Sequence, residues 1–182
     1  MTILDYIKSG GEVMYILLAM NTLGVALIIW KFFSFYGEKK LISFNAQEIL
    51  RSLQKDHHNF QHDSFVLEMA KDRVYSVGHS MGKGLNTIKI IATISPLLGL
   101  LGTALGVLSA FQAIATHGMS EPSFFANGIS MALITTVGGL IVAIPHFISY
   151  NYLTSWLNSY EVKLEDQVFE QYLKHKNEKG EG

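Results

Sequence analysis

The chain has 182 residues, no cysteine and a formal net charge of −1. This charge excludes the basic footprint of a nucleic-acid-binding protein, and the lack of cysteine excludes disulfides and thiolate chemistry. Charged residues are absent from Ile90 to Ser120 and from Pro122 to Tyr160. Each stretch is longer than the about 20 residues with which a helix crosses a bilayer. The sequence therefore predicts an integral membrane protein.

The chain begins with a short polar segment and a first apolar stretch. We expect residues 1–12 to lie outside the cytoplasm and residues 13–33 to form transmembrane helix 1, interrupted only by Asn21, Thr22 and Lys31. A lysine near the end of a span can extend to the interface, and the aromatic residues around it are typical of an interfacial belt. The stretch is too long for the apolar region of a cleaved signal peptide, so we expect a retained helix.

Residues 34–88 are too short and too charged for a separate domain, and we expect them to form a cytoplasmic helical segment. LISFNAQEILRSL and SFVLEMAKDRVYSV both have apolar residues at helical spacing, which predicts two helices. DHHNFQHD lies between them and is rich in turn formers. It contains His57, His58 and His62, which include one pair at i and i+4. A solvated turn explains them better, so neither a metal site nor a cofactor is predicted.

GHSMG, from Gly78 to Gly82, matches the G-x-S-x-G pattern of a nucleophile elbow. That motif needs a strand before it, a helix after it and a large sheet behind it. None of these is predicted here. We interpret the motif as a glycine-rich break between cytoplasmic helices, and we do not expect an enzyme.

The second half of the chain is dominated by two apolar segments. We expect transmembrane helix 2 over residues 89–116, an extracytoplasmic hairpin over 117–123, transmembrane helix 3 over 124–149, and a cytoplasmic helix and tail over 150–182. In the last segment apolar positions recur every three or four residues: Leu153, Leu157, Tyr160, Leu164, Val168 and Tyr172. This spacing predicts that the third span continues as an amphipathic helix.

Lysine and arginine set the expected orientation. They are concentrated between the first two spans and after the third, and residues 117–123 contain none. The positive-inside rule then predicts an outside N-terminus and a cytoplasmic C-terminus. The predicted fold class is an all-α integral membrane protein with three transmembrane helices and long cytoplasmic helical extensions, assembled as an oligomeric helix bundle.

Small and polar residues form one stripe on each of the last two spans. The first stripe consists of Ser95, Gly99, Gly102, Thr103, Gly106 and Ala110. The second consists of Gly128, Ala132, Thr135, Thr136, Gly139 and Ala143. Such stripes let helices approach closely in lipid, so tight packing explains most of the glycines.

The threonines and prolines of these spans occur at matching depths. Thr103 and Thr136 are equally far from the hairpin centre, so they are expected at one level near the middle of the bilayer. Pro96 and Pro145 lie nearer the cytoplasm, where each removes a backbone hydrogen bond and leaves a carbonyl without its donor. A single threonine usually bonds its own helix, but two at one level indicate a polar band.

The spans offer few groups that could carry a proton. Only His146 and His117 could bind and release one near neutral pH, and they lie toward opposite ends of the spans. Three helices cannot enclose a pore by themselves. A proton path would therefore need further copies of the chain and a carrier on another protein.

The motifs SPLLGLLGTALG and GISMALITTVGGLIVAIPHFISYN resemble the ExbB/TolQ/MotA proton-channel family, specifically its three-span ExbB and TolQ branch. The resemblance is specific over roughly residues 88–152. GGEVMYILL is a weaker match that favours ExbB over TolQ. Four-span MotA-type subunits are longer.

The resemblance implies particular residues for proton transfer. Thr103 and Thr136 map onto the family's threonines, whereas the glutamate of its G-I-A-E-A-L pattern falls on Met131. The expected proton-pathway residues are Thr103, Thr136, Thr135, Met131 and Ser95. The expected packing and kink residues are Pro96, Gly99, Gly102, Gly106, Gly139 and Pro145.

The resemblance also implies partners and a function. We expect a homopentamer in the bacterial inner membrane, surrounding about two copies of an ExbD-like or TolR-like single-span partner with an intramembrane aspartate. The proton motive force would then energise outer-membrane transport through a TonB-like or TolA-like protein. A TolQ-like role in a Tol-Pal-type envelope system and a small-solute transporter are the alternatives. Membrane lipid is an expected partner, and nucleic acid is not.

Overall fold

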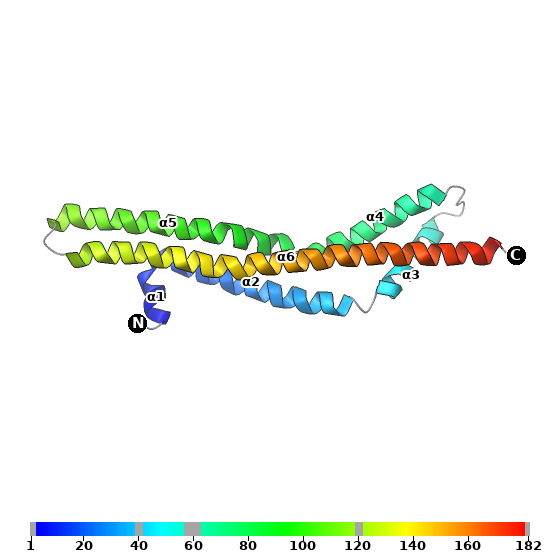
Figure 1. The fold of residues 1–182 in the computed structure, drawn as a ribbon, viewed down its shortest axis with the longest axis horizontal. Coiled ribbons are helices and arrows are strands. Elements are labelled where there is room, and N and C mark those ends of the chain that lie inside the picture. The colour runs from blue at the N-terminus through cyan, green and yellow to red at the C-terminus, as the bar shows by residue number, and fades with distance from the viewer. Residues whose placement is uncertain (1–2, 39–41, 57–62, 119–121, 181–182) are drawn as a thin grey trace. The chain divides into compact units, whose positions relative to one another are not determined.

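The computed structural model describes residues 3–38, 42–56, 63–118 and 122–180, which fold into helices joined by short turns (Figure 1). The helices are α1 (Ile3–Ser9), α2 (Gly11–Glu38), α3 (Ile42–Asp56), α4 (Asp63–Gly82), α5 (Leu85–His117) and α6 (Pro122–Gly180). These described ranges contain no strand, so the predicted all-α class is confirmed.

Three helices are long and apolar enough to cross a membrane. The apolar parts lie in α2, α5 and α6, over Gly11–Gly37, Leu85–Thr116 and Phe125–Lys176. The prediction of a membrane protein with three apolar helices is confirmed. The span limits and the orientation of the termini remain predictions.

Glycines end the helices where the chain turns. Gly11, Gly84 and Gly118 have φ angles of 63°, 90° and 69°, in the left-handed region that side chains disfavour. Gly84 separates α4 from α5, and Gly118 follows α5. Proline suits the first turn of a helix, and α6 begins at Pro122.

α6 is a single helix of 59 residues, so the third span and the predicted amphipathic segment are continuous. Pro145 lies inside α6 and Pro96 inside α5, and neither interrupts its helix.

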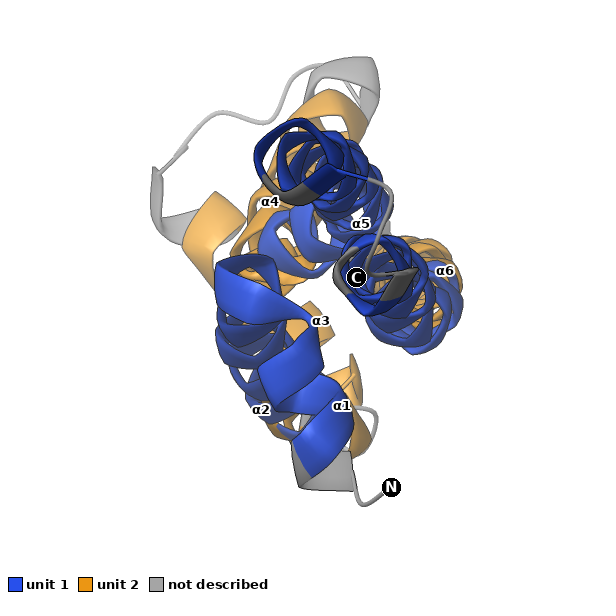
Figure 2. Ribbon diagram, turned by 90° about the vertical axis from the view of Figure 1, so that its left-hand side faces the viewer, with its two compact units in different colours: residues 1–29, 86–151 blue, residues 30–85, 152–182 orange. Residues whose placement is uncertain are grey.

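The chain divides into two compact units (Figure 2). Unit 1 comprises residues 1–29 and 86–151, and unit 2 comprises residues 30–85 and 152–182.

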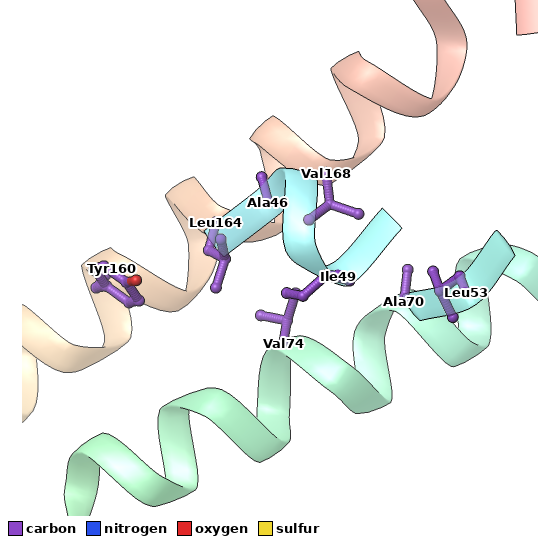
Figure 3. Close-up of a cluster of buried hydrophobic side chains, with 8 residues drawn as sticks. All are labelled: Ala46, Ile49, Leu53, Ala70, Val74, Tyr160, Leu164 and Val168. Carbon is purple, nitrogen blue, oxygen red and sulfur yellow. The ribbon is translucent and has the colours of Figure 1, made fainter. Parts of the chain in front are cut away.

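Unit 2 has a core of apolar side chains from α3, α4 and α6 (Figure 3). Its members are Ala46, Ile49, Leu53, Ala70, Val74, Tyr160, Leu164 and Val168. They come from α3, α4 and α6, where apolar residues at three-to-four spacing predicted helices. Asn45 Nδ2 donates to the Tyr160 hydroxyl at 2.7 Å, which satisfies the polar end of a buried ring.

The predicted break at GHSMG is wrong, because α4 continues through it to Gly82 and the break falls at Lys83 and Gly84. A Cβ on Gly78 would lie 1.7 Å from a Glu161 carboxylate oxygen of α6. The first glycine therefore leaves room for the Glu161 side chain. No strand precedes the motif in the described residues, so the context of a nucleophile elbow is absent there.

Lys31 lies near the end of the first predicted span and is enclosed by protein. Its side chain is buried in unit 2, and Nζ donates to the Met81 carbonyl at 2.7 Å. Nζ also lies 4.8 Å from the centre of the Trp30 ring. The ammonium group thereby stabilises the carbonyl end of α4.

Candidate functional site

In unit 1, α5 and α6 approach each other backbone to backbone. A Cβ on Gly139 would lie 2.6 Å from the Ser95 carbonyl oxygen, and one on Gly106 would lie 2.7 Å from the Gly128 carbonyl oxygen. A Cβ on Gly99 would lie 2.9 Å from the Thr135 carbonyl oxygen. The two stripes therefore face each other within one chain, with Gly99, Gly106 and Gly139 at the points of closest approach.

Two of the predicted pathway hydroxyls are enclosed in this contact. Ser95 and Thr135 are both 0% exposed. Ser95 Oγ donates to the Ile91 carbonyl at 2.6 Å, and Thr135 Oγ1 lies 3.0 Å from the Met131 carbonyl. A Cβ on Gly102 would lie 2.5 Å from Thr135 Oγ1, so this side chain fills the space above the glycine. Within one chain both hydroxyls serve helix packing, and their place in a proton pathway remains a prediction.

Thr103 and Thr136 form the polar pair that the sequence predicted at one depth. Their Oγ1 atoms are hydrogen bonded to each other across the α5–α6 interface. Thr103 Oγ1 also lies 3.2 Å from the Gly99 carbonyl oxygen and 3.1 Å from the Ala132 carbonyl oxygen. Both side chains are half-buried, which places the pair at an edge of the interface.

This threonine pair can exchange donor and acceptor roles. One hydroxyl donates to the other, and the second can donate to a carbonyl or to a group outside the interface. A hydroxyl can donate to a carboxylate and can accept from a protonated carboxyl group. The pair can therefore contact a carboxyl group in both protonation states without carrying charge.

Pro96 precedes Thr103 in α5, and Pro145 follows Thr136 in α6. Pro96 in α5 leaves the Ala92 carbonyl without its helical donor, and Pro145 in α6 does the same for Ile141. Ala92 is buried, whereas the Ile141 residue is exposed. The two carbonyls thus belong to residues of different exposure.

Met131 is not brought to the threonine pair. Its side chain reaches the junction of α1 and α2, where a Cβ on Gly11 would lie 2.8 Å from Met131 Cε. Met131 and Thr136 are five positions apart, which corresponds to a rotation of about 140° around a helix. The two residues therefore lie on different faces of α6, and a shared pathway role for Met131 remains a prediction.

A proton carrier is missing beside the pair. α5 contains no acidic residue, and α6 contains none before Glu161. In the described residues no group of three His, Asp or Glu side chains could hold a metal ion, and the predicted turn with His57, His58 and His62 lies outside them. The threonine pair can solvate a titrating group, and neither α5 nor α6 before Glu161 supplies a carboxyl group for it.

A sequence profile of the MotA/TolQ/ExbB proton channel family matches residues 42–166. The chain belongs to this family. The match covers α3, α4, α5 and most of α6, including the threonine pair and both prolines. The predicted resemblance is confirmed, and the family is one of proton channels and not a known class of enzymes.

Individual relatives carry ExbB and TolQ names. The chain is 40% identical over 88 residues to the biopolymer transport protein exbB1 of Vibrio cholerae, which covers 48% of this chain and 39% of that protein. It is 38% identical over 94 residues to the ExbB protein of Salmonella typhimurium, and the alignment covers 52% of this chain and 38% of that protein. The Tol-Pal system protein TolQ of Haemophilus influenzae is 39% identical over 71 residues, and the alignment covers 39% of this chain and 31% of that protein. The alignments thus span less than half the length of these relatives.

Proposed function

We propose that the chain is an ExbB-like proton-channel subunit of an inner-membrane motor that uses the proton motive force to energise outer-membrane transport. The observation that carries this proposal is the threonine pair, Thr103 and Thr136, at the edge of the α5–α6 interface. Family membership and the predominance of ExbB names among the relatives support it.

The proposed proton carrier is an intramembrane aspartate on a single-span partner of the ExbD or TolR type. The threonine hydroxyls solvate this carboxyl group as it gains and loses its proton. Each charge that crosses a potential of 100 mV releases about 2.3 kcal/mol, which drives the partner's movement within the oligomer. A TonB-like or TolA-like protein then carries the energy toward the outer membrane.

The proposed assembly is a homopentamer around two partner helices, with the N-terminus in the periplasm. The small stripes of α5 and α6 already pack against each other, so contacts between copies need other surfaces. α5 offers Leu97, Leu100 and Leu101, which are 50–63% exposed. In a bilayer such side chains suit either lipid or a neighbouring copy.

The deciding experiment measures proton flux in vesicles that contain the chain with its partner. In the double variant Thr103→Val, Thr136→Val, the shape is nearly unchanged and the hydroxyls are removed. Interhelical hydrogen bonds in membranes average about 0.6 kcal/mol, so assembly should persist. Leaving the carboxyl group unsolvated costs several kcal/mol, which should slow flux by at least about a hundredfold.

Thr93→Val is the matched control, because Thr93 also lies on α5 but is exposed and bonds only the Lys89 carbonyl of its own helix, at 2.8 Å. It should conduct like the wild type. Wild-type flux in an assembled double variant would reduce the threonine pair to packing and remove the proposal's main support.

A TolQ-like role in an envelope system is the second candidate, favoured by the similarity to the TolQ protein of Haemophilus influenzae. Expression in bacteria that lack either ExbB or TolQ distinguishes the two roles. Restored transport in the first strain supports the ExbB-like role, and restored envelope integrity in the second supports the TolQ-like role.

A further inference from the structure

A histidine of α6 is enclosed in unit 1 and takes no part in the proposed threonine site. His146 is 0% exposed. Its Nε2 has no hydrogen-bond partner among the described residues. Buried polar atoms are nearly always paired, so an unpaired ring nitrogen in a membrane helix requires an explanation.

The other ring nitrogen identifies the form of the imidazole. His146 Nδ1 lies 2.6 Å from the Val142 carbonyl oxygen, one turn earlier in α6. A carbonyl oxygen only accepts, so Nδ1 carries the hydrogen. In the neutral ring Nε2 then holds a lone pair and no hydrogen.

Gly24 of α2 makes the space that this ring occupies. A Cβ on Gly24 would lie 2.0 Å from His146 Nε2, 2.4 Å from its Cδ2 and 3.1 Å from Ile91 Cδ1. The ring edge therefore lies directly on the α2 backbone. Any side chain at position 24 would displace the imidazole.

The helices around His146 contain no acidic residue that could neutralise an imidazolium. α2 has none between Glu12 and Glu38, α5 has none, and α6 has none before Glu161. The titratable groups nearest in sequence to the contact are Tyr150 on α6, Lys89 on α5, whose Nζ lies 5.8 Å from the Tyr150 ring centre, and Lys31 on α2, which binds the Met81 carbonyl. None of these groups is a carboxylate, so none of them can neutralise an imidazolium.

We infer that His146 is a proton-binding site that holds α2 against α6 only while its ring is neutral. A proton taken up by the Nε2 lone pair forms an N–H bond that points at the Gly24 backbone, where the structure shows no acceptor. It also creates a positive charge without a counter-ion between apolar helices. The ring must then leave its place, and the contact between α2 and α6 opens. This inference goes beyond the proposed function and does not depend on proton conduction through the threonine pair.

The test measures the distance between α2 and α6 with spin labels in the full-length protein. The chain has no cysteine, so labels can be placed at Leu23→Cys and Ile144→Cys, which are 65% and 57% exposed and adjoin the contact. Protein diluted with unlabelled chain is measured in lipid nanodiscs at about pH 8 and about pH 5, on either side of the ordinary titration of imidazole. We expect one narrow distance at the higher pH and a longer, broader distribution at the lower pH.

Two variants in the same labelled background make the result decisive. His146→Leu keeps an apolar group against Gly24 and cannot bind a proton, so its distance should not change with pH. Gly24→Ala should show the longer distance at both pH values, because its methyl group displaces the ring. The exposed His79 provides the matched control, and His79→Gln should respond like the wild type.

The inference is overturned if the wild-type distance does not change with pH, or if His146→Leu changes as much as the wild type. Should His146→Leu not fold, a Gly24→Ala protein whose distance matches the wild type at the higher pH would also overturn it.

Discussion

The α5–α6 contact of unit 1 and the core of unit 2 achieve close packing by opposite means. In unit 1 the glycines Gly99, Gly106 and Gly139 bring two backbones into contact, and the enclosed hydroxyls bond mainly to carbonyls of their own helix. In unit 2 the contact consists of large apolar side chains such as Leu53 and Leu164.

The two kinds of packing suit two different solvents, lipid for the α5–α6 contact and water for the apolar core. Between helices in lipid there is no hydrophobic driving force, because lipid tails are as apolar as leucine, so shape and backbone proximity hold the helices together. In water, burial of a leucine side chain stabilises by about 2 kcal/mol. α6 is one helix, but it packs through glycines in unit 1 and through apolar side chains in unit 2. The substitutions below alter contacts in one unit or the other.

The largest effect is expected for Gly139→Leu in unit 1. The new Cβ would lie 2.6 Å from a backbone oxygen, which cannot move as a flexible side chain can. We expect a loss of stability of about 4 kcal/mol or more, in the exceptional range for one substitution. Thermal unfolding in detergent measures it. Gly37→Leu is the control, since a Cβ there meets no described atom within 4 Å, and equal stability of the two variants would refute backbone contact.

A smaller but still large effect is expected for Leu164→Ala in unit 2. Leu164 is 0% exposed, and its removal leaves a cavity in the core. Such changes cost about 2–5 kcal/mol. Val162→Ala on the exposed side of α6 should cost less than about 0.5 kcal/mol. Denaturant unfolding compares the two, and indistinguishable curves would mean that the unit 2 core does not stabilise the protein.

An effect of about 1 kcal/mol is expected for Lys31→Met. The substitution keeps the apolar stem and removes the ammonium group from the Met81 carbonyl at the end of α4. Hydrogen exchange of the last turn of α4 should increase. Lys83→Met, at an exposed lysine two residues farther along, should leave it unchanged. Unaltered exchange in Lys31→Met would show that the buried ammonium does not stabilise this helix end.

The smallest effect is expected for Ser80→Ala. Ser80 is exposed on α4 and belongs to the GHSMG motif. A nucleophile elbow needs a strand before its serine, and the described residues contain no strand. Stability and proton flux should equal those of the wild type. Covalent labelling of the wild type by a serine-directed phosphonate, absent in Ser80→Ala, would instead indicate a reactive serine.

The sequence by itself determined the class of the protein and its family. Long uncharged stretches require helices in a bilayer, since only a helix satisfies all backbone groups within one segment. Apolar residues at three-to-four spacing predicted α3, α4 and the continuation of α6. The equal distance of Thr103 and Thr136 from the hairpin predicted that they lie at one level, because antiparallel helices rise at the same rate per residue. Their hydrogen bond was seen only in the structure.

Only the tertiary structure decided which polar side chains are enclosed between the helices and which remain accessible. Ser95 and Thr135 belong to the same stripes as Thr103 and Thr136, yet they are fully enclosed while the other two remain half-buried. Helical spacing gives the face on which a residue lies, but the rotation of two helices against each other sets which edge stays open. Met131 was similarly placed by motif, and its contact with Gly11 depends on how α1 turns away from α2.

The same limit applies to contacts between residues far apart in the chain. Gly78 looked like a helix break, because its role depends on Glu161 of another helix, 83 positions away in the sequence. Gly24 and His146 carry no local signal of each other. Such pairs are determined by distances between helices, which local sequence patterns do not encode.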